Sequence, residues 1–165
     1  MTLRISKALL VAAVAAFYTL IVFNNGTDYG SNYQFVHHVM LMDTTFPGNQ
    51  GMWRAIHSTF FYKMFYNGII VWEAVTMVLC WIGSVQMLRR LRGSVGAFQE
   101  ASRMAVAGLT IGMLMWLIAF LAVGGEWFLM WQSQTWNGQG AAFRMFTVMG
   151  LVLLLAVMPE RGNPA

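Results

Sequence analysis

Charged residues are scarce in this chain of 165 residues. They make up 10% of it, whereas soluble domains average about 25%. Hydrophobic residues make up 58%, and the mean hydropathy is +0.59. Because so few charged residues cannot cover a water-exposed surface, the composition predicts an integral membrane protein. The length allows one compact unit, and we treat residues 1–165 as a single integral membrane domain.

Acidic residues are fewer than basic ones, and the formal net charge is +4. An excess of positive charge can indicate nucleic-acid binding. Here the basic residues gather at the ends of apolar runs rather than along one face. This pattern is typical of membrane topology signals, so we expect the lipid bilayer, and no nucleic acid, as a partner.

Cysteine and catalytic motifs are nearly absent. Cys80 stands alone within an apolar run, which excludes a disulfide framework or a thiolate metal cluster within one chain. There is no nucleophile elbow, phosphate-binding glycine loop or zinc-protease motif. No histidine lies inside an apolar run, which disfavours haem held between helices. We therefore expect no enzymatic activity and predict no cofactor.

Four apolar runs are long enough to cross a bilayer, which requires about 20 mostly apolar residues. They cover residues 5–23, 64–82, 104–123 and 141–158 approximately. The first run could be a signal peptide, because Ala13, Val14 and Ala15 have the spacing that a peptidase recognises. Cleavage there would leave too short an apolar core, so we favour an uncleaved helix. The fold class is all-α, a bundle of four transmembrane helices.

The connection 83–103 determines the expected orientation. Its charged residues are four arginines and one glutamate: Arg89, Arg90, Arg92, Arg103 and Glu100. A short basic loop remains in the cytoplasm, and Arg4 and Lys7 place the N-terminus on the same side. With four spans the C-terminus is cytoplasmic too, which predicts a multi-pass protein of the bacterial inner membrane.

The other two connections, 24–63 and 124–140, should form a periplasmic cap. Turn-forming residues begin the first one, and then Tyr33–Asp43 shows helical spacing of apolar residues, which predicts a short amphipathic helix. Trp127, Trp131 and Trp136 are typical of a membrane–water interface. The charged residues on this side include the candidate cap charges Asp28, Asp43, Arg54, Glu126 and Arg144. We expect Glu126 to pair with Arg54 or Arg144 and so join the two connections.

Glu73 is an ionisable residue near the middle of the second span. Tyr66, Thr76 and Cys80 share its helical face. A carboxyl group at this depth is costly unless it has a partner. Three interpretations remain open: a neutral, hydrogen-bonded structural residue, a transport or proton-relay group, and a contact with a partner subunit.

Two further patterns are weaker. His37, His38, Met40 and Met42, with His57 further on, combine ligands that suit copper, which suggests copper or redox-cofactor handling. They equally fit ordinary histidines and apolar methionines of a surface helix. Gly108 and Gly112 are spaced for close helix packing, either within the protein or between copies.

Two polar stretches carry a family resemblance. FNN at Phe23–Asn25, TDY at Thr27–Tyr29 and HHVMLMDTTFPGN at His37–Asn49 resemble the bacterial predicted small integral membrane proteins named domain of unknown function 2165, as does GGEWFLMWQSQTWNGQ at Gly124–Gln139. The resemblance implies a four-helix inner-membrane protein and supplies no site residues. We expect a non-enzymatic structural or accessory subunit, associated with further copies or another membrane protein. The alternative functions are a small oligomeric transporter or channel using Glu73, and the periplasmic copper handler.

Overall fold

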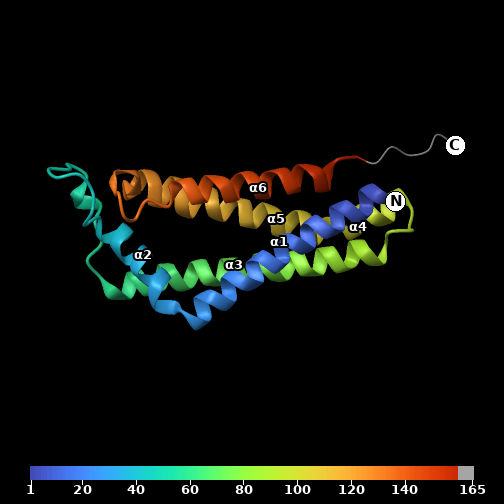
Figure 1. Cartoon of the computed structure of the whole chain (residues 1–165), viewed down its shortest axis with the longest axis horizontal. Coiled ribbons are helices and arrows are strands. Elements are labelled where there is room, and N and C mark those ends of the chain that lie inside the picture. The colour runs from blue at the N-terminus through green and yellow to red at the C-terminus, as the bar shows by residue number, and fades with distance from the viewer. Residues whose placement is uncertain (160–165) are drawn as a thin grey trace.

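The computed structural model describes residues 1–159, which are helical and contain no strand within that range. Four long helical segments are joined by short ones (Figure 1). The long segments are α1 (Thr2–Thr27), α3 (Thr59–Arg89), α5 (Arg103–Met115) continued by the π-helix η2 (Trp116–Trp127), and α6 (Gln139–Val157). The short ones are α2 (Tyr29–Leu41), η1 (Met52–Arg54), α4 (Val95–Ala101) and η3 (Met130–Gln132).

The four long segments are the candidate membrane spans. Each contains an 18-residue stretch with a mean hydropathy between 1.8 and 2.3, so each is long and apolar enough to cross a bilayer. The four predicted spans correspond to these four candidate spans. Around the bundle α1 packs on α3, α3 on α5, α5 on α6, and α6 on α1.

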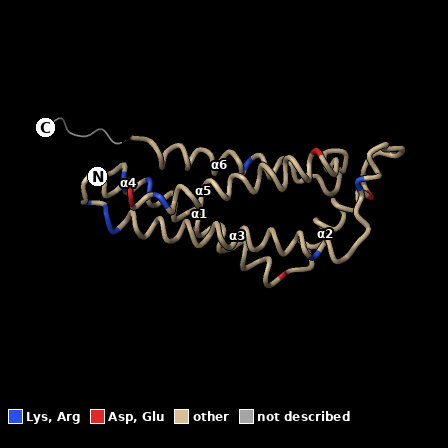
Figure 2. The backbone as a smooth tube through the Cα atoms, turned by 180° about the vertical axis from the view of Figure 1, so that it is seen from behind, with Lys and Arg blue, Asp and Glu red and all other residues tan. Residues whose placement is uncertain are grey.

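Both ends of the described chain lie at one end of the bundle, which we call the terminal end (residues 1–7, 89–103 and 156–159). Lys7 Nζ donates to the carbonyl oxygens of Ala156 at 3.4 Å and Met158 at 2.5 Å. Arg4 Nη1 donates to those of Leu91 and Gly93. Figure 2 shows lysines and arginines gathered here. The opposite end, called the distal end, contains residues 28–58 and 126–138.

Glycine lets α3 and α5 approach closely. A Cβ atom on Gly83 would overlap the backbone of Ala105, and one on Gly108 would lie 2.9 Å from Leu79 Cβ and Cys80 Sγ. A Cβ atom on Gly112 would likewise lie too close to side-chain atoms of Thr76, Met149 and Tyr18. The predicted packing stripe therefore contacts helices of the same chain and is not open to a second copy.

Three boundaries differ from the sequence expectation. The turn expected after residue 23 does not form, because α1 continues to Thr27 and the chain breaks only at Asp28 before α2 begins. The helix expected at Tyr33–Asp43 begins at Tyr29 and ends at Leu41, where Met42 adopts a left-handed conformation with φ of 57°. Residues 83–103 are mostly helical, because α3 runs to Arg89 and Ser94 caps α4.

Candidate functional site around Glu73

Glu73 is buried in the middle of α3, with 4% of its surface exposed. Its Oε2 accepts a hydrogen bond from Asn25 Nδ2 at 2.6 Å. Among residues 1–159, Glu73 accepts this side-chain hydrogen bond through Oε2, and none is made to Oε1. Tyr66, Thr76 and Cys80 lie buried on the same helix, as the helical spacing predicts. Glu73 therefore offers one hydrogen-bonding position that the surrounding protein leaves free.

Asn25 orients this carboxyl group. The Asn25 Oδ1 atom accepts two hydrogen bonds, from Tyr66 Oη at 3.0 Å and from Asn32 Nδ2 at 2.7 Å. An amide oxygen has two lone pairs, so both are used and the NH₂ group must face Glu73. The network links α1 and α3 through buried polar atoms, which strengthens those bonds relative to water, and links α1 to α2 through a part-buried bond.

Asn25 and Asn32 were not among the predicted site residues. Their surroundings, NNGTDYGSN, are rich in turn formers, so the local pattern indicated a loop outside the membrane. The useful signal was the spacing from Asn25 back to Tyr18 and Ala15, which places all three on one helical face if the helix continues. All three are buried in the structure.

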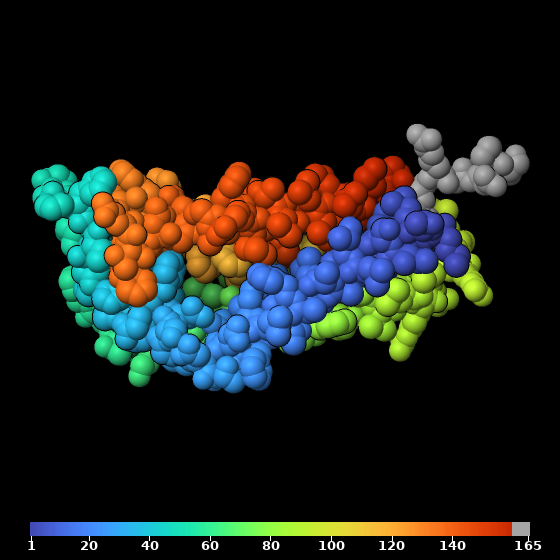
Figure 3. Space-filling view, in the orientation of Figure 1, coloured from blue at the N-terminus to red at the C-terminus, as the bar shows by residue number. Residues whose placement is uncertain are grey.

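A cavity of about 280 Å³ lies beside Glu73. Its walls come from α1, α2, α3, η2 and the start of α6. Four aromatic side chains line it together with Glu73 and Asn25: Phe35, Tyr66, Trp116 and Phe120. Figure 3 shows a hollow on this side, bordered by α6 and by α1 and α2. Among residues 1–159, the cavity lining contains one acidic residue and no lysine or arginine.

A second cavity of about 330 Å³ lies next to the first, between α2, α3 and η2. Its lining residues are apolar and include Met64, Gly68 and Trp72 of α3. Four residues line both cavities: Phe35, Val36, Ile69 and Phe120. The rings of Phe35 and Phe120 stack with centroids 6.2 Å apart. These two side chains therefore form part of the wall between the cavity that contains Glu73 and the apolar cavity.

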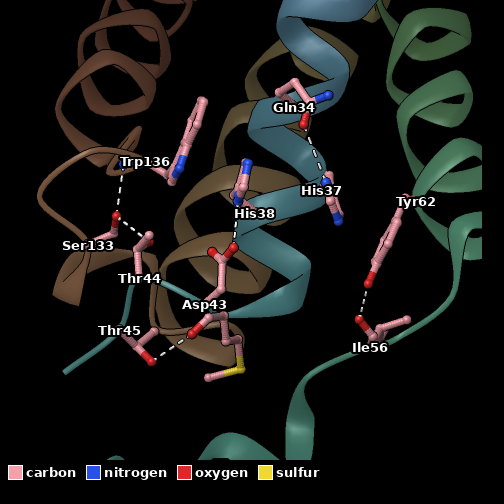
Figure 4. A network of polar contacts seen from close by, with 11 residues as sticks. Gln34, His37, His38, Asp43, Thr44, Thr45, Ile56, Tyr62, Ser133 and Trp136 are labelled. Carbon is pink, nitrogen blue, oxygen red and sulfur yellow. Dashed lines mark hydrogen bonds and ion pairs between the residues drawn. The ribbon is translucent and has the colours of Figure 1, made fainter. Parts of the chain in front are cut away.

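The predicted histidine cluster makes polar and aromatic contacts (Figure 4). His38 Nδ1 lies 2.6 Å from Asp43 Oδ2, and its ring stacks on Trp136. His37 lies near Gln34 and Tyr62, while His57 is exposed before α3. Met40 and Met42 are buried in a hydrophobic cluster. Within residues 1–159, no three His, Cys, Asp or Glu side chains are placed to hold a metal ion.

The predicted ion pair of Glu126 is wrong. Arg54 Nη1 instead donates to the backbone carbonyl oxygens of Trp127 at 3.2 Å and Glu126 at 3.4 Å. Carbonyl groups at a helix end lack helical partners, so they are good acceptors for a guanidinium group. The Glu126 carboxylate and Arg144 are exposed and form no ion pair among the described residues. Asp28 is exposed at the break between α1 and α2.

The two distal segments are nevertheless joined by further hydrogen bonds between neutral groups. Thr44 Oγ1 and Ser133 Oγ are 2.7 Å apart. Gln132 Oε1 accepts hydrogen bonds from Phe46 N at 3.1 Å and Asn49 Nδ2 at 3.2 Å. Contact between the connections 24–63 and 124–140 is therefore real, and it combines the Arg54 guanidinium group with hydroxyl, amide and backbone groups.

Comparison with known proteins identifies the family of this chain. The model of the family described as "predicted small integral membrane protein (DUF2165)" matches residues 3–159. The chain belongs to this family. The match covers all four candidate spans and both distal segments, including Glu73 and Asn25. No curated protein and no solved structure matches this member of the family.

Proposed function

We propose that this protein is a non-enzymatic binding protein of the bacterial inner membrane, holding a lipid-soluble molecule in the Glu73 cavity. The observation that supports this best is the free Oε1 atom of a buried carboxyl group beside a cavity on the side of the bundle. An ionisable group inside a membrane costs several kcal/mol unless it is used or paired. A ligand that enters from the bilayer supplies the missing partner.

Binding agrees with the packing better than conduction through one copy. Between Glu73 and the terminal end, the core contains closely packed apolar side chains that are fully buried: Ala8, Val11, Ala15, Cys80, Ala105 and Leu109. A transporter or channel using Glu73 would need a path through this region or between several copies. Trp116 lines the cavity, and its Nε1 donates to Tyr18 Oη at 2.9 Å.

Glu73→Gln should abolish retention of the bound molecule. Glutamine has the same shape, and its oxygen can still accept from Asn25. The free position, however, would then carry an uncharged NH₂ donor in place of a carboxylate oxygen. Wild type and variant are extracted gently from the same membranes, and the lipid-soluble compounds retained are compared by mass spectrometry. We expect a compound retained by the wild type to fall about tenfold or more.

Glu126→Gln is the matched control. The same change is made on an exposed glutamate at the distal end, and retention should equal that of the wild type. Equal retention by the Glu73→Gln variant, or no retained compound in the wild type, would overturn the proposed function.

An accessory-subunit role is the second candidate, supported by the distal surface. Trp53, Phe46, Trp127 and Trp131 are 72%, 53%, 49% and 44% exposed there. Aromatic side chains are enriched at protein interfaces. The same gentle extraction should then yield a stoichiometric partner protein, and Trp53→Ser should reduce its recovery. A lone monomer would argue against this role.

The proposed orientation has both termini in the cytoplasm and the distal end in the periplasm. Basic residues at the terminal end support it, since cytoplasmic loops carry an excess of lysine and arginine. Alkaline phosphatase, which is active only in the periplasm, should be inactive when fused after residue 165 and active when inserted after Gly48. The reverse pattern of activities would place the distal end in the cytoplasm.

A further inference from the structure

We infer that the ligand of the Glu73 cavity is a lipophilic cation, with an amine or quaternary ammonium head beside Glu73 and its tail in the adjacent apolar cavity. This inference rests on the proposed function and deepens it. Three features of the Glu73 cavity support it: its charge, its aromatic lining, and the wall that this cavity shares with the second one.

Charge favours a cationic head. Within the part of the chain that the structure describes, Glu73 is the one carboxylic acid in the lining, and no lysine or arginine lines the cavity. The free Oε1 atom is an acceptor in the ionised form, and Asn25 already stabilises that form by donating to Oε2. An anionic head, such as a phosphate or carboxylate, would meet Glu73 without a compensating positive charge.

The aromatic lining favours the same class. Phe35, Tyr66, Trp116 and Phe120 surround the space beside Glu73. The ring faces are electron-rich and attract an ammonium group, most strongly in a site without water. The Trp116 and Phe120 rings pack with centroids 4.7 Å apart, so together they present a broad aromatic wall. Rings of this kind combined with one carboxylate suit an organic cation better than a small alcohol.

The second cavity provides a place for the tail. It shares Phe35, Val36, Ile69 and Phe120 with the first cavity, and its own lining is apolar. The proposal requires a side chain at this wall to move aside so that the two cavities join. At about 280 and 330 Å³, each cavity alone is at or below the lower end of the usual range of ligand pockets, roughly 300–1,000 Å³. A ligand that extends across the wall makes use of both.

The test uses three photoprobes with the same 12-carbon chain and a diazirine at its far end. Their heads are trimethylammonium, hydroxyl and carboxylate. Each is added to the full-length protein in lipid nanodiscs, irradiated, and located by mass spectrometry of peptides. We expect the cationic probe to label the protein about tenfold or more above the other two, and Glu73→Gln, but not Glu126→Gln, to remove that excess.

The position of the label tests the tail. It should fall within residues 35–40, 64–72 or 118–130, the segments that contribute lining residues to the apolar cavity. Gly68→Leu should fill that cavity and reduce this labelling, because a side chain on Gly68 meets open space rather than protein. Gly140→Leu is the control, since Gly140 is equally open but lines neither cavity.

The outcomes separate the two proposals. Stronger Glu73-dependent labelling by the alcohol or the carboxylate would overturn the cationic assignment and leave the binding function standing. Glu73-dependent labelling on the outer faces of α1 or α6 would place the tail in the bilayer and overturn its assignment to the second cavity. No Glu73-dependent labelling by any probe would overturn this inference, and failure of the retention experiment as well would overturn the proposed function.

Discussion

Replacing Gly83 by alanine should lower the free energy of unfolding of the bundle by about 3 kcal/mol, through overpacking. The added methyl group would overlap the backbone nitrogen and Cα atoms of Ala105. Backbone atoms cannot rotate away as a flexible side chain can, so α3 and α5 would have to move apart. Their separation would weaken the packing along one of the main helix interfaces of the bundle. The measurement is unfolding by sodium dodecyl sulfate in mixed micelles.

Gly68→Ala is the control for this prediction. It makes the same substitution in the same helix, but a Cβ atom there meets nothing within 4 Å. Alanine is favoured over glycine within helices by about 1 kcal/mol, so this variant should be as stable as the wild type or slightly more so. If the two variants unfold alike, α3 and α5 do not approach as closely at Gly83 as the structure shows.

The four spans could be predicted from sequence because each is a long apolar run, which leaves little choice of structure in a membrane. Their ends could not. Asn24–Thr27 has the composition of a turn, yet it forms the last turn of α1, because Asn25 finds partners on α2 and α3. Local propensity carries no information about such partners. The pattern of apolar residues likewise does not indicate that η2 is a π-helix.

The site was predicted in part. Glu73 was identified because an acid within an apolar run is costly, and its helical face is buried as expected. Its partner Asn25 was missed, since the two residues are 48 positions apart. The predicted ion pair of Glu126 does not form, because Arg54 donates to backbone carbonyl oxygens instead. The positions of charged residues in a sequence do not reveal such backbone acceptors. Contacts over long sequence separations depend on packing, which a single sequence does not display.

Asn25→Leu should destabilise the protein by about 3 kcal/mol. The substitution removes the donor to Glu73 and the acceptor of Tyr66 and Asn32. Glu73 and Tyr66 are 4% and 2% exposed, so water does not readily replace the lost bonds. A buried polar group without a partner costs its full desolvation energy, which is more than the net gain of the bond itself.

The double variant Asn25→Leu/Glu73→Leu should therefore be more stable than the sum of the two single changes predicts. Once Asn25 is gone, replacing Glu73 removes an unpaired carboxyl group instead of breaking a bond. We expect a coupling energy of roughly 1–3 kcal/mol in a double-mutant cycle measured by the same unfolding assay.

Ser84→Ala combined with Asn25→Leu is the reference pair for this cycle. Ser84 is buried on α3 and donates to the carbonyl oxygen of Ala8, so its loss also removes a buried hydrogen bond. It lies about 16 Å from Glu73 along the helix, by the rise per residue. Its effect should add to that of Asn25→Leu within about 0.5 kcal/mol. Equal additivity in both pairs would mean that the Asn25–Glu73 bond does not stabilise the fold, and that Glu73 is held in place by packing alone.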